Sequence, residues 1–277
     1  MPGKLILVGT PIGNLSDFSP RAVQALRECD FIAAEDTRVT LKLLNHFEIK
    51  KPMVSYFEHN KRERGIQIVE RIKAGETCCL VTDAGMPAIS DPGEDIVALC
   101  YEEGISVGVV PGPSALIAAL AVSGIPTGRF TFEGFLSMNR KNRREHLESL
   151  INERRTMIFY EAPHKLPSTL NDLLSTLGDR RIAIVRELTK VHEEVIRTTL
   201  SAAVERFKTE NPRGEIVLVV EGAAEETVVQ EYTIQQAVDI AKNFMDEGMS
   251  ASEAAKQAAA VTGIKKGEIY RGLNKLK

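Results

Sequence analysis

The sequence predicts an α/β fold in which a parallel sheet is covered by helices on both faces. Short apolar stretches alternate with amphipathic ones through the first half of the chain, and the loops after the apolar stretches are rich in glycine and proline. This alternation is typical of the strand–helix units that build a parallel sheet. A length of 277 residues and a hydrophobic content of 43% are sufficient for one large or two medium domains with a substantial core.

Five strands are expected in the first half, with helices between most of them. The strands are predicted at residues 5–8, 31–34, 53–56, 78–81 and 105–110, and the helices at 20–29, up to 73, at 94–103 and up to 123–124. Ser19 and Pro20 mark the first helix start, because serine caps a helix and proline fits its first position. Local signals of this kind predict where each element begins or ends.

The second half is expected to form another α/β domain followed by a small helical module. Pro126 and Gly128 indicate a domain boundary near residues 124–129. Strands are predicted at 130–135, 157–160, 182–185 and 216–220, and three helices at 234–245, 251–260 and 266–276. The three helices resemble a helix-turn-helix module with a basic last segment, for which nucleic-acid contact and a packing or oligomerisation role are both open. The predicted domains are 1–124, 125–225 and 226–277.

Composition restricts the class of protein. The net charge of −3 and the pI near 6.0 give no overall basic signal, so any nucleic acid must bind a local patch. Four cysteines without C-x-x-C spacing are expected to be small buried side chains in a reducing cytoplasm. No targeting segment and no apolar stretch of bilayer length is evident, which predicts a cytoplasmic protein without a membrane anchor.

Residues 80–93, with the sequence LVTDAGMPAISDPG, are the most informative stretch. They follow a predicted strand, and α/β folds bind ligands where strands end in loops. The loop lacks a glycine-rich phosphate cradle and a Lys-Ser/Thr pair, which indicates a ligand without phosphates. The alternative is a surface loop stiffened by Pro87 and Pro92.

Charged clusters at other strand ends have two interpretations each. Residues 35–38 (EDTR) can be a helix start capped by Asp36 or Thr37, or a polar wall of a ligand cleft. Residues 140–144 (RKNRR) form the strongest basic cluster, although a solvated helix face is the alternative. His164 and His192 lack metal-ligand spacing and no G-x-S-x-G motif occurs, so neither a metal site nor hydrolase chemistry is expected.

Six motifs occur together in one order along the chain. They are residues 9–14 (GTPIGN), 35–38 (EDTR), 83–93 (DAGMPAISDPG), 110–115 (VPGPSA), 159–164 (FYEAPH) and 186–190 (RELTK). From Leu5 to about Val220 this set resembles the ribosomal RNA ribose methyltransferases of the tetrapyrrole methylase family, which use S-adenosylmethionine. The resemblance implies two α/β domains with the cofactor cleft between them, a small C-terminal helical module and a homodimer. It also implies 2′-O-methylation of a cytidine ribose near the decoding centre of 16S ribosomal RNA, within the small ribosomal subunit.

The resemblance also implies site residues by position. The expected cofactor contacts are Pro11, Ile12, Asp83, Gly85, Met86, Ile89, Ser114, Ala115, Tyr160 and Gly214. Methyl transfer requires alignment of oxygen, methyl carbon and sulfur, and a ribose hydroxyl benefits from a base or a cation. Our hypothesis is that Glu187 accepts the hydroxyl proton, and that Lys190 holds a phosphate or lowers the hydroxyl pKa.

RNA contact is expected from cations on the surface, namely Arg38, Lys61, Arg140, Arg143, Arg144 and the basic tail. The aromatic content of 5%, without tryptophan, favours recognition of shape over base stacking. Two alternatives are kept. One is a tetrapyrrole (precorrin-type) C-methyltransferase on the same fold, and the other is a non-catalytic RNA-binding ribosome assembly factor.

Overall fold

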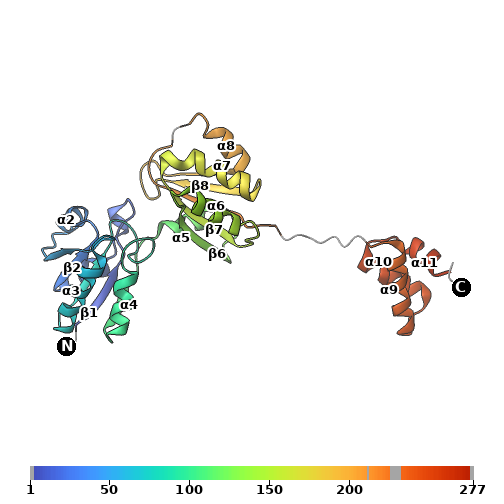
Figure 1. The fold of residues 1–277 in the computed structure, drawn as a ribbon, viewed down its shortest axis with the longest axis horizontal. Helices are drawn as coiled ribbons and strands as arrows, with labels where there is room; N and C mark the ends of the chain where they lie inside the picture. Colours follow the sequence, from blue (N-terminus) through green and yellow to red (C-terminus); the bar gives the residue numbers. More distant parts are fainter. Residues whose placement is uncertain (1–2, 211, 225–231, 275–277) are drawn as a thin grey trace. The chain divides into compact units, whose positions relative to one another are not determined.

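The computed structural model describes residues 3–210, 212–224 and 232–274 (Figure 1). Contacts between residues divide the chain into two compact units, Met1–Ala224 and Glu225–Lys277. The first unit contains two five-stranded sheets, and the second contains helices. No helix among the described residues has the length and apolar character needed to cross a membrane.

The first sheet is entirely parallel, as predicted. Its strands are β1 (Lys4–Val8), β2 (Phe31–Ala34), β3 (Met53–Ser55), β4 (Cys78–Val81) and β5 (Ser106–Val110), in the spatial order β3-β2-β4-β1-β5. The carboxyl ends of all five strands therefore lie at the same edge of the sheet. β2 and β4 are buried along their whole length, which explains their continuous apolar sequences.

Helices cover both faces of this sheet. They are α1 (Pro20–Glu28), α2 (Thr37–His46), α3 (Lys61–Lys73) and α4 (Glu94–Glu102), preceded by the 3-10 helix η1 (Leu15–Asp17). One core joins Leu26 and Leu44 from α1 and α2, and the other joins Ile68 and Ile96 from α3 and α4. Ser19 caps α1 by accepting a hydrogen bond from the Ala22 N–H, at 3.1 Å, as the sequence predicts.

The second sheet is mixed. Its strands are β6 (Phe130–Phe135), β7 (Thr156–Glu161), β8 (Arg181–Arg186), β9 (Glu194–Thr199) and β10 (Ile216–Val220), in the order β6-β7-β10-β8-β9. β6 and β7 are parallel, and the other pairs are antiparallel. β9 was not predicted from the sequence, because this edge strand carries charged and half-exposed residues in place of a continuous apolar stretch.

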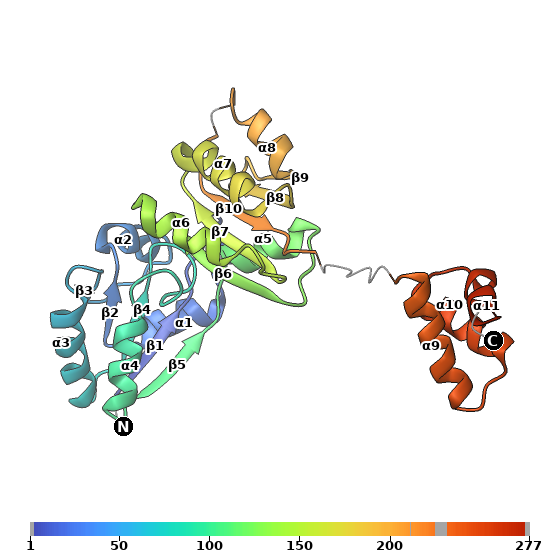
Figure 2. The same ribbon diagram turned by 45° about the vertical axis from the view of Figure 1, so that its right-hand side comes forward.

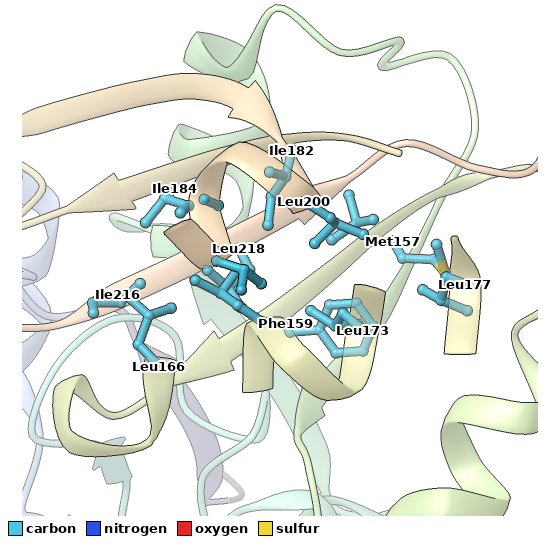
Figure 3. Close-up of a cluster of buried hydrophobic side chains, with 14 of the residues drawn as sticks. Met157, Phe159, Leu166, Leu173, Leu177, Ile182, Ile184, Leu200, Ile216 and Leu218 are labelled. Atoms are coloured by element: carbon cyan, nitrogen blue, oxygen red, sulfur yellow. The ribbon is translucent and has the colours of Figure 1, made fainter. Parts of the chain in front are cut away.

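Two layers of helices cover the second sheet (Figure 2). One face packs against α6 (Arg140–Ser149), α7 (Leu166–Leu177) and α8 (Leu200–Arg206). The 3-10 helix η2 (Pro163–Lys165) directly precedes α7. Figure 3 shows this core, where Phe159 and Leu218 of the sheet meet Leu173 of α7. The other face packs against the apolar helix α5 (Ala115–Ser123), through contacts such as Leu120.

The second unit is a three-helix module of α9 (Ile234–Asp246), α10 (Ala251–Thr262) and α11 (Lys266–Asn274). Thr233 and Ser250 start the first two helices with complete capping boxes. Alanines of α9 and α10 fill its core together with Ile269 of α11, so the helices pack closely. Lys275 and Lys277 of the basic tail lie outside the described residues.

Candidate active site

A cavity of about 380 Å³ opens between the two sheets of the first unit. One wall comes from the loops that follow β1, β4 and β5 of the first sheet, and the other from the ends of β7 and β10 of the second. We call it the inter-sheet cavity. Its lining residues are Ile12, Ala84, Gly85, Met86, Ile89, Ser90, Asp91, Ser114, Ala115, Phe135, Tyr160, Glu161, Ala162, Pro163, Gly214, Glu215, Ile216 and Val217.

Backbone contacts between loops shape the first wall. Thr10 and Gly85 exchange two backbone hydrogen bonds of 2.8 and 3.2 Å, which tie the loop after β1 to the loop after β4. Gly9 and Gly112 bring the loop after β5 against the same place, since a Cβ on Gly9 would lie 2.7 Å from the Gly112 Cα. These glycines are therefore required for the close approach of three loops.

The loop after β4 has an unusual backbone. Ala88 and Ser90 have φ of +67° and +68°, a left-handed conformation that residues with a side chain rarely adopt. Gly93 has φ of +150°, and a Cβ there would lie 2.9 Å from the Ala88 N. Such strain persists only where the surroundings enforce it, and it is concentrated at functional sites. Here it presents Ser90 and Asp91 to the cavity.

Most of the predicted cofactor residues come together in this cavity. Eight of the ten line it: Ile12, Gly85, Met86, Ile89, Ser114, Ala115, Tyr160 and Gly214. Pro11 and Asp83 instead line a neighbouring cavity of about 210 Å³, together with Thr10 and Thr82 of the same two loops. Strand-end loops that are separate in the sequence thus form one site.

Aromatic side chains pack together in the opposite wall of the cavity. The Tyr160 ring packs edge-on against Phe132 and Phe135, with ring centroids 5.0 and 5.5 Å apart. Burial raises the pKa of the Tyr160 hydroxyl, so it stays protonated at neutral pH. Phe135, at the end of the strand predicted for residues 130–135, was not predicted as a site residue from the sequence.

Asp91 is one of three acidic residues that line the cavity, with Glu161 and Glu215, and it was not predicted as a site residue from the sequence. Burial raises its pKa to about 6, and the negative charges of Glu35 and Asp83 add to the effect. Burial also raises the pKa of Asp83, whose Oδ1 accepts a hydrogen bond from the Asp36 N–H at 3.1 Å. The available signal for Asp91 was its position in the same loop as Asp83.

The structure confirms one of the two interpretations of residues 35–38. Asp36 caps α2, since its Oδ1 accepts a hydrogen bond from the Arg38 N–H at 2.8 Å. Glu35 lines neither cavity, although its Oε2 accepts a hydrogen bond at 2.6 Å from the hydroxyl of Thr82, which lines the smaller one, so the polar wall stays a prediction. Arg38 itself is 87% exposed and pairs with Asp36 at 2.6 Å.

Glu187 and Lys190 form an ion pair directly behind the cavity wall. Lys190 Nζ donates to Glu187 Oε1 at 2.9 Å and to Glu215 Oε2 at 3.1 Å. The Glu215 N–H also donates to Glu187 Oε1, at 3.0 Å. Neither Glu187 nor Lys190 lines the cavity, but Gly214 does, and a Cβ on Gly214 would overlap the Glu187 carboxylate.

These bonds set the protonation of the pair. The Lys190 ammonium lowers the pKa of Glu187, assisted by the Glu215 N–H. Burial opposes the charge of Lys190, but the bonds to Glu187 and Glu215 outweigh it and raise the pKa of Lys190. Both groups are therefore charged at neutral pH.

The remaining predicted RNA contacts lie at separate places. Lys61 begins α3 and pairs with Glu58 at 2.9 Å and Asp95 at 2.7 Å, which raise its pKa. Arg140, Arg143 and Arg144 lie together at the start of α6, along a second hollow. The four cysteines are free and buried, as predicted.

The lining chemistry of the inter-sheet cavity defines its ligand class. Ile12, Met86 and Val217 give it apolar surface, while Asp91 supplies negative charge. No lysine, arginine or histidine lines it among the described residues. Within the same part of the chain, no group of three or more His, Cys, Asp or Glu side chains is arranged to hold a metal. The cavity therefore suits an organic ligand that has positive charge and no phosphate.

Comparison with known proteins gives several matches over most of the chain. The family described as tetrapyrrole (corrin/porphyrin) methylases matches residues 4–204. The chain is 46% identical over 270 residues to the "Ribosomal RNA small subunit methyltransferase I" of a Synechocystis strain, covering 97% of this chain and 96% of the relative. A protein of the same name from Thermotoga maritima is 52% identical over 220 residues, covering 79% of this chain and 99% of the relative.

Solved structures share the fold at low sequence identity. The methyltransferase CobJ superposes with a TM-score of 0.60 at 20% identity, covering 80% of this chain and 95% of that protein. A uroporphyrin-III C-methyl transferase from Thermus thermophilus, complexed with S-adenosyl homocysteine, gives a TM-score of 0.54 at 20% identity over 78% and 97% of the two chains. From the family match over most of its length and these close relatives, it follows that the chain belongs to the tetrapyrrole methylase family.

Proposed function

We propose that this S-adenosylmethionine-dependent methyltransferase modifies small-subunit ribosomal RNA, by 2′-O-methylation of a cytidine ribose near the decoding centre of the 16S molecule. The observation that carries the substrate class is the high identity, over nearly the whole chain, to relatives named ribosomal RNA small subunit methyltransferase I. The specific nucleotide rests on the six motifs of the sequence.

The inter-sheet cavity fits S-adenosylmethionine, which supplies a methyl group on a positively charged sulfur. Ile12, Met86 and Ile89 offer apolar contacts, and Gly85 leaves its backbone open to the ligand. Asp91 provides a negative charge in the same cavity, and the absence of cations from the described lining matches a ligand without phosphates. We therefore assign the eight lining residues predicted from the sequence to the cofactor, and Pro11 and Asp83 to the support of the same loops.

Asp91 is better suited than Glu187 to accept the ribose proton. It lines the cavity, and a pKa of about 6 leaves its carboxylate ionised at neutral pH but more basic than an ordinary aspartate, as a proton acceptor requires. Glu187 lies behind the wall, and its carboxylate already accepts bonds from Lys190 and the Glu215 N–H, which lower its pKa. We therefore propose Asp91 as the proton acceptor.

Lys190 is the proposed cation at this site. One of its two partners, Glu215, has a 74% exposed side chain and lines the cavity rim. An incoming phosphate or developing alkoxide can replace that carboxylate, while Glu187 keeps the ammonium in place. Glu187 is thereby a positioning residue for Lys190.

A second copy of this chain is the proposed partner in a homodimer. β5 is an edge strand of the first sheet, and its Val107 and Val109 are exposed, the latter to 57%. Ile117 of α5 exposes a further apolar side chain. An exposed apolar edge strand favours covering by another chain.

The remaining expectations fit this function. The four free cysteines and a ribosomal substrate favour the cytoplasm. We also propose the division into domains 1–124, 125–225 and 226–277, since each sheet and the helical module has its own core clusters. Arg38 and Lys61 are proposed to contact RNA at the edge of the first sheet.

The test is nucleoside mass spectrometry on small ribosomal subunits that lack the modification, after incubation with the protein and S-adenosylmethionine. We expect new 2′-O-methylcytidine in the 16S RNA. Methyl transfer to a precorrin-type substrate with none to RNA would establish the tetrapyrrole alternative. No binding of the cofactor in calorimetry would establish the non-catalytic assembly factor.

A further inference from the structure

A second hollow of about 670 Å³ lies along α6 and α7. We call it the α6–α7 groove. It shares no lining residue with the inter-sheet cavity, yet the two are adjacent along the chain. Glu161, Ala162 and Pro163 line the cavity, and His164 and Lys165 line the groove. Because Pro163 and His164 are consecutive, one Cα–Cα step of about 3.8 Å separates the two linings.

The groove has an excess of positive charge, although the whole chain has a net charge of −3. Its basic residues are Arg140, Arg143, Arg144, His164 and Lys165, and its acidic residues are Glu148 and Asp172. Arg144 pairs with Glu148 at 3.4 Å, and both side chains are exposed, so this pair is weak. Arg140 and Lys165 have no ion-pair partner among the described residues. Their charges are available to a ligand.

Arg143 is different from its neighbours, because its side chain is only 14% exposed. Its Nε donates to Asp172 Oδ2 at 2.6 Å, and its Nη2 donates to the Thr169 hydroxyl at 2.9 Å. Thr169 in turn donates to the buried carboxylate of Glu161, which also accepts from the Ala162 N–H at 2.8 Å. Arg143 thus braces the floor of the groove against the end of β7.

We propose, on the basis of the function proposed above, that the α6–α7 groove binds the phosphodiester backbone of the RNA strand adjoining the methylated nucleotide. Arg140, Arg144 and Lys165 are the phosphate contacts, while Arg143 supports the groove and contacts no phosphate. The occupant is an anion with repeated charges, because the free cations are spread along the groove. An RNA strand whose ribose enters the inter-sheet cavity passes directly beside it. Contacts of this kind fix the register of the strand and not its sequence.

The experiment compares two double variants that remove equal charge. Arg140→Ala/Lys165→Ala changes the groove, and Lys141→Ala/Lys208→Ala changes exposed lysines of the same domain that do not line it. Binding of naked 16S RNA is measured over a range of salt concentrations. Methylation of small subunits and cofactor affinity are measured in parallel.

We expect the groove variant to raise the KM for subunits about tenfold or more, with unchanged kcat and cofactor affinity. Two lost phosphate contacts reduce the slope of log affinity against log salt by about 1.4 to 1.8. The control variant should stay within about twofold of the wild type. Arg143→Lys, which retains the charge, should keep the wild-type salt slope.

Several results would overturn the proposal. Equal RNA affinities of the two double variants would exclude the groove, and so would an unchanged salt slope in the groove variant. Weaker binding of the groove variant to subunits, with normal binding to naked RNA, would show that the groove meets a ribosomal protein. Failure of the wild type to methylate any RNA would count against the proposed function alone, because the affinity comparison does not depend on turnover.

Discussion

The inter-sheet cavity and the α6–α7 groove are separated by a single step of the chain, but they are built by different means. The cavity is shaped by backbone: paired glycines, left-handed residues and hydrogen bonds between loops. The groove is shaped mainly by side chains on α6 and α7, and most of its lining side chains are charged or polar. Substitutions in the cavity should therefore cause large, salt-independent losses. Substitutions in the groove should cause graded losses that depend on salt.

The largest effect is expected from Asp91→Asn. Loss of a proton acceptor should reduce the single-turnover methylation rate about 100- to 1000-fold at pH 7.5 or so. The wild-type rate should fall as the pH drops through about 6, where Asp91 becomes protonated, and the variant should lack this dependence. A variant with the wild-type rate at saturating RNA would remove Asp91 from the mechanism.

Asp91→Asn, which should lower the methylation rate, should raise the free energy of unfolding. Asp91 has a folded-state pKa of about 6 against a usual value of 3.8, so the folded protein binds this proton more tightly than the unfolded chain. The wild type therefore loses stability as the pH rises through this window. Asp91→Asn should gain about 1 kcal/mol above pH 6, after allowance for solvent screening, and nothing below pH 4 or so. Urea unfolding at both pH values measures the difference.

The next largest effect is expected from Gly9→Ala. The added methyl group would meet the Gly112 backbone at 2.7 Å, which would push apart two loops of the cavity. We expect a loss of about 2–3 kcal/mol in cofactor binding, or roughly 30- to 150-fold, measured by calorimetry. Gly108→Ala on β5 is the matched control, because its Cβ meets no atom within 4 Å. Equal affinities of the two variants would contradict the role of backbone shape.

Arg143→Ala tests the brace between groove and cavity. Removal of the guanidinium leaves the Thr169 and Asp172 partners without their donor, so the free energy of unfolding should fall by about 2 kcal/mol. Arg140→Ala is the control on the same helix, and its stability should stay within about 0.5 kcal/mol of the wild type. Denaturant unfolding distinguishes them, and equal stabilities would mean that Arg143 is no brace.

The smallest effect is expected from the ion pair behind the wall. Lys190→Ala should reduce the single-turnover rate about tenfold, and Glu187→Gln somewhat less, because an isosteric amide retains part of the contact with Lys190. Both are measured with saturating RNA. If neither variant changes the rate, the pair has no part in catalysis.

Much of the fold could be predicted because it depends on local signals. Ser19 before Pro20 predicted the start of α1, and continuous apolar stretches predicted β2 and β4, where both faces are buried. β9 could not be found in this way, because an edge strand with one open side needs no apolar pattern. Eight of the ten residues that the motif resemblance predicts as cofactor contacts line one cavity, and their binding of the cofactor stays a prediction.

The parts that could not be predicted depend on contacts distant in the sequence. Nothing near Arg143 distinguishes it from Arg140 and Arg144, since its partner Asp172 is 29 residues away. The left-handed conformations of Ala88 and Ser90 have no signature either, because both residue types usually avoid this region. Burial in the folded protein raises the pKa of Asp91, and the charge of Glu35, which follows β2 beside β4, raises it further.

The hydrogen-bonded chain from Arg143 through Thr169 to Glu161 gives the cavity and the groove a common wall. Any coupling of the two binding events through this wall is thermodynamically reciprocal. Whatever factor bound RNA applies to the affinity for the cofactor, the cofactor applies to the affinity for RNA. The order in which the two ligands arrive can then alter the rate of assembly of the ternary complex, but not its stability.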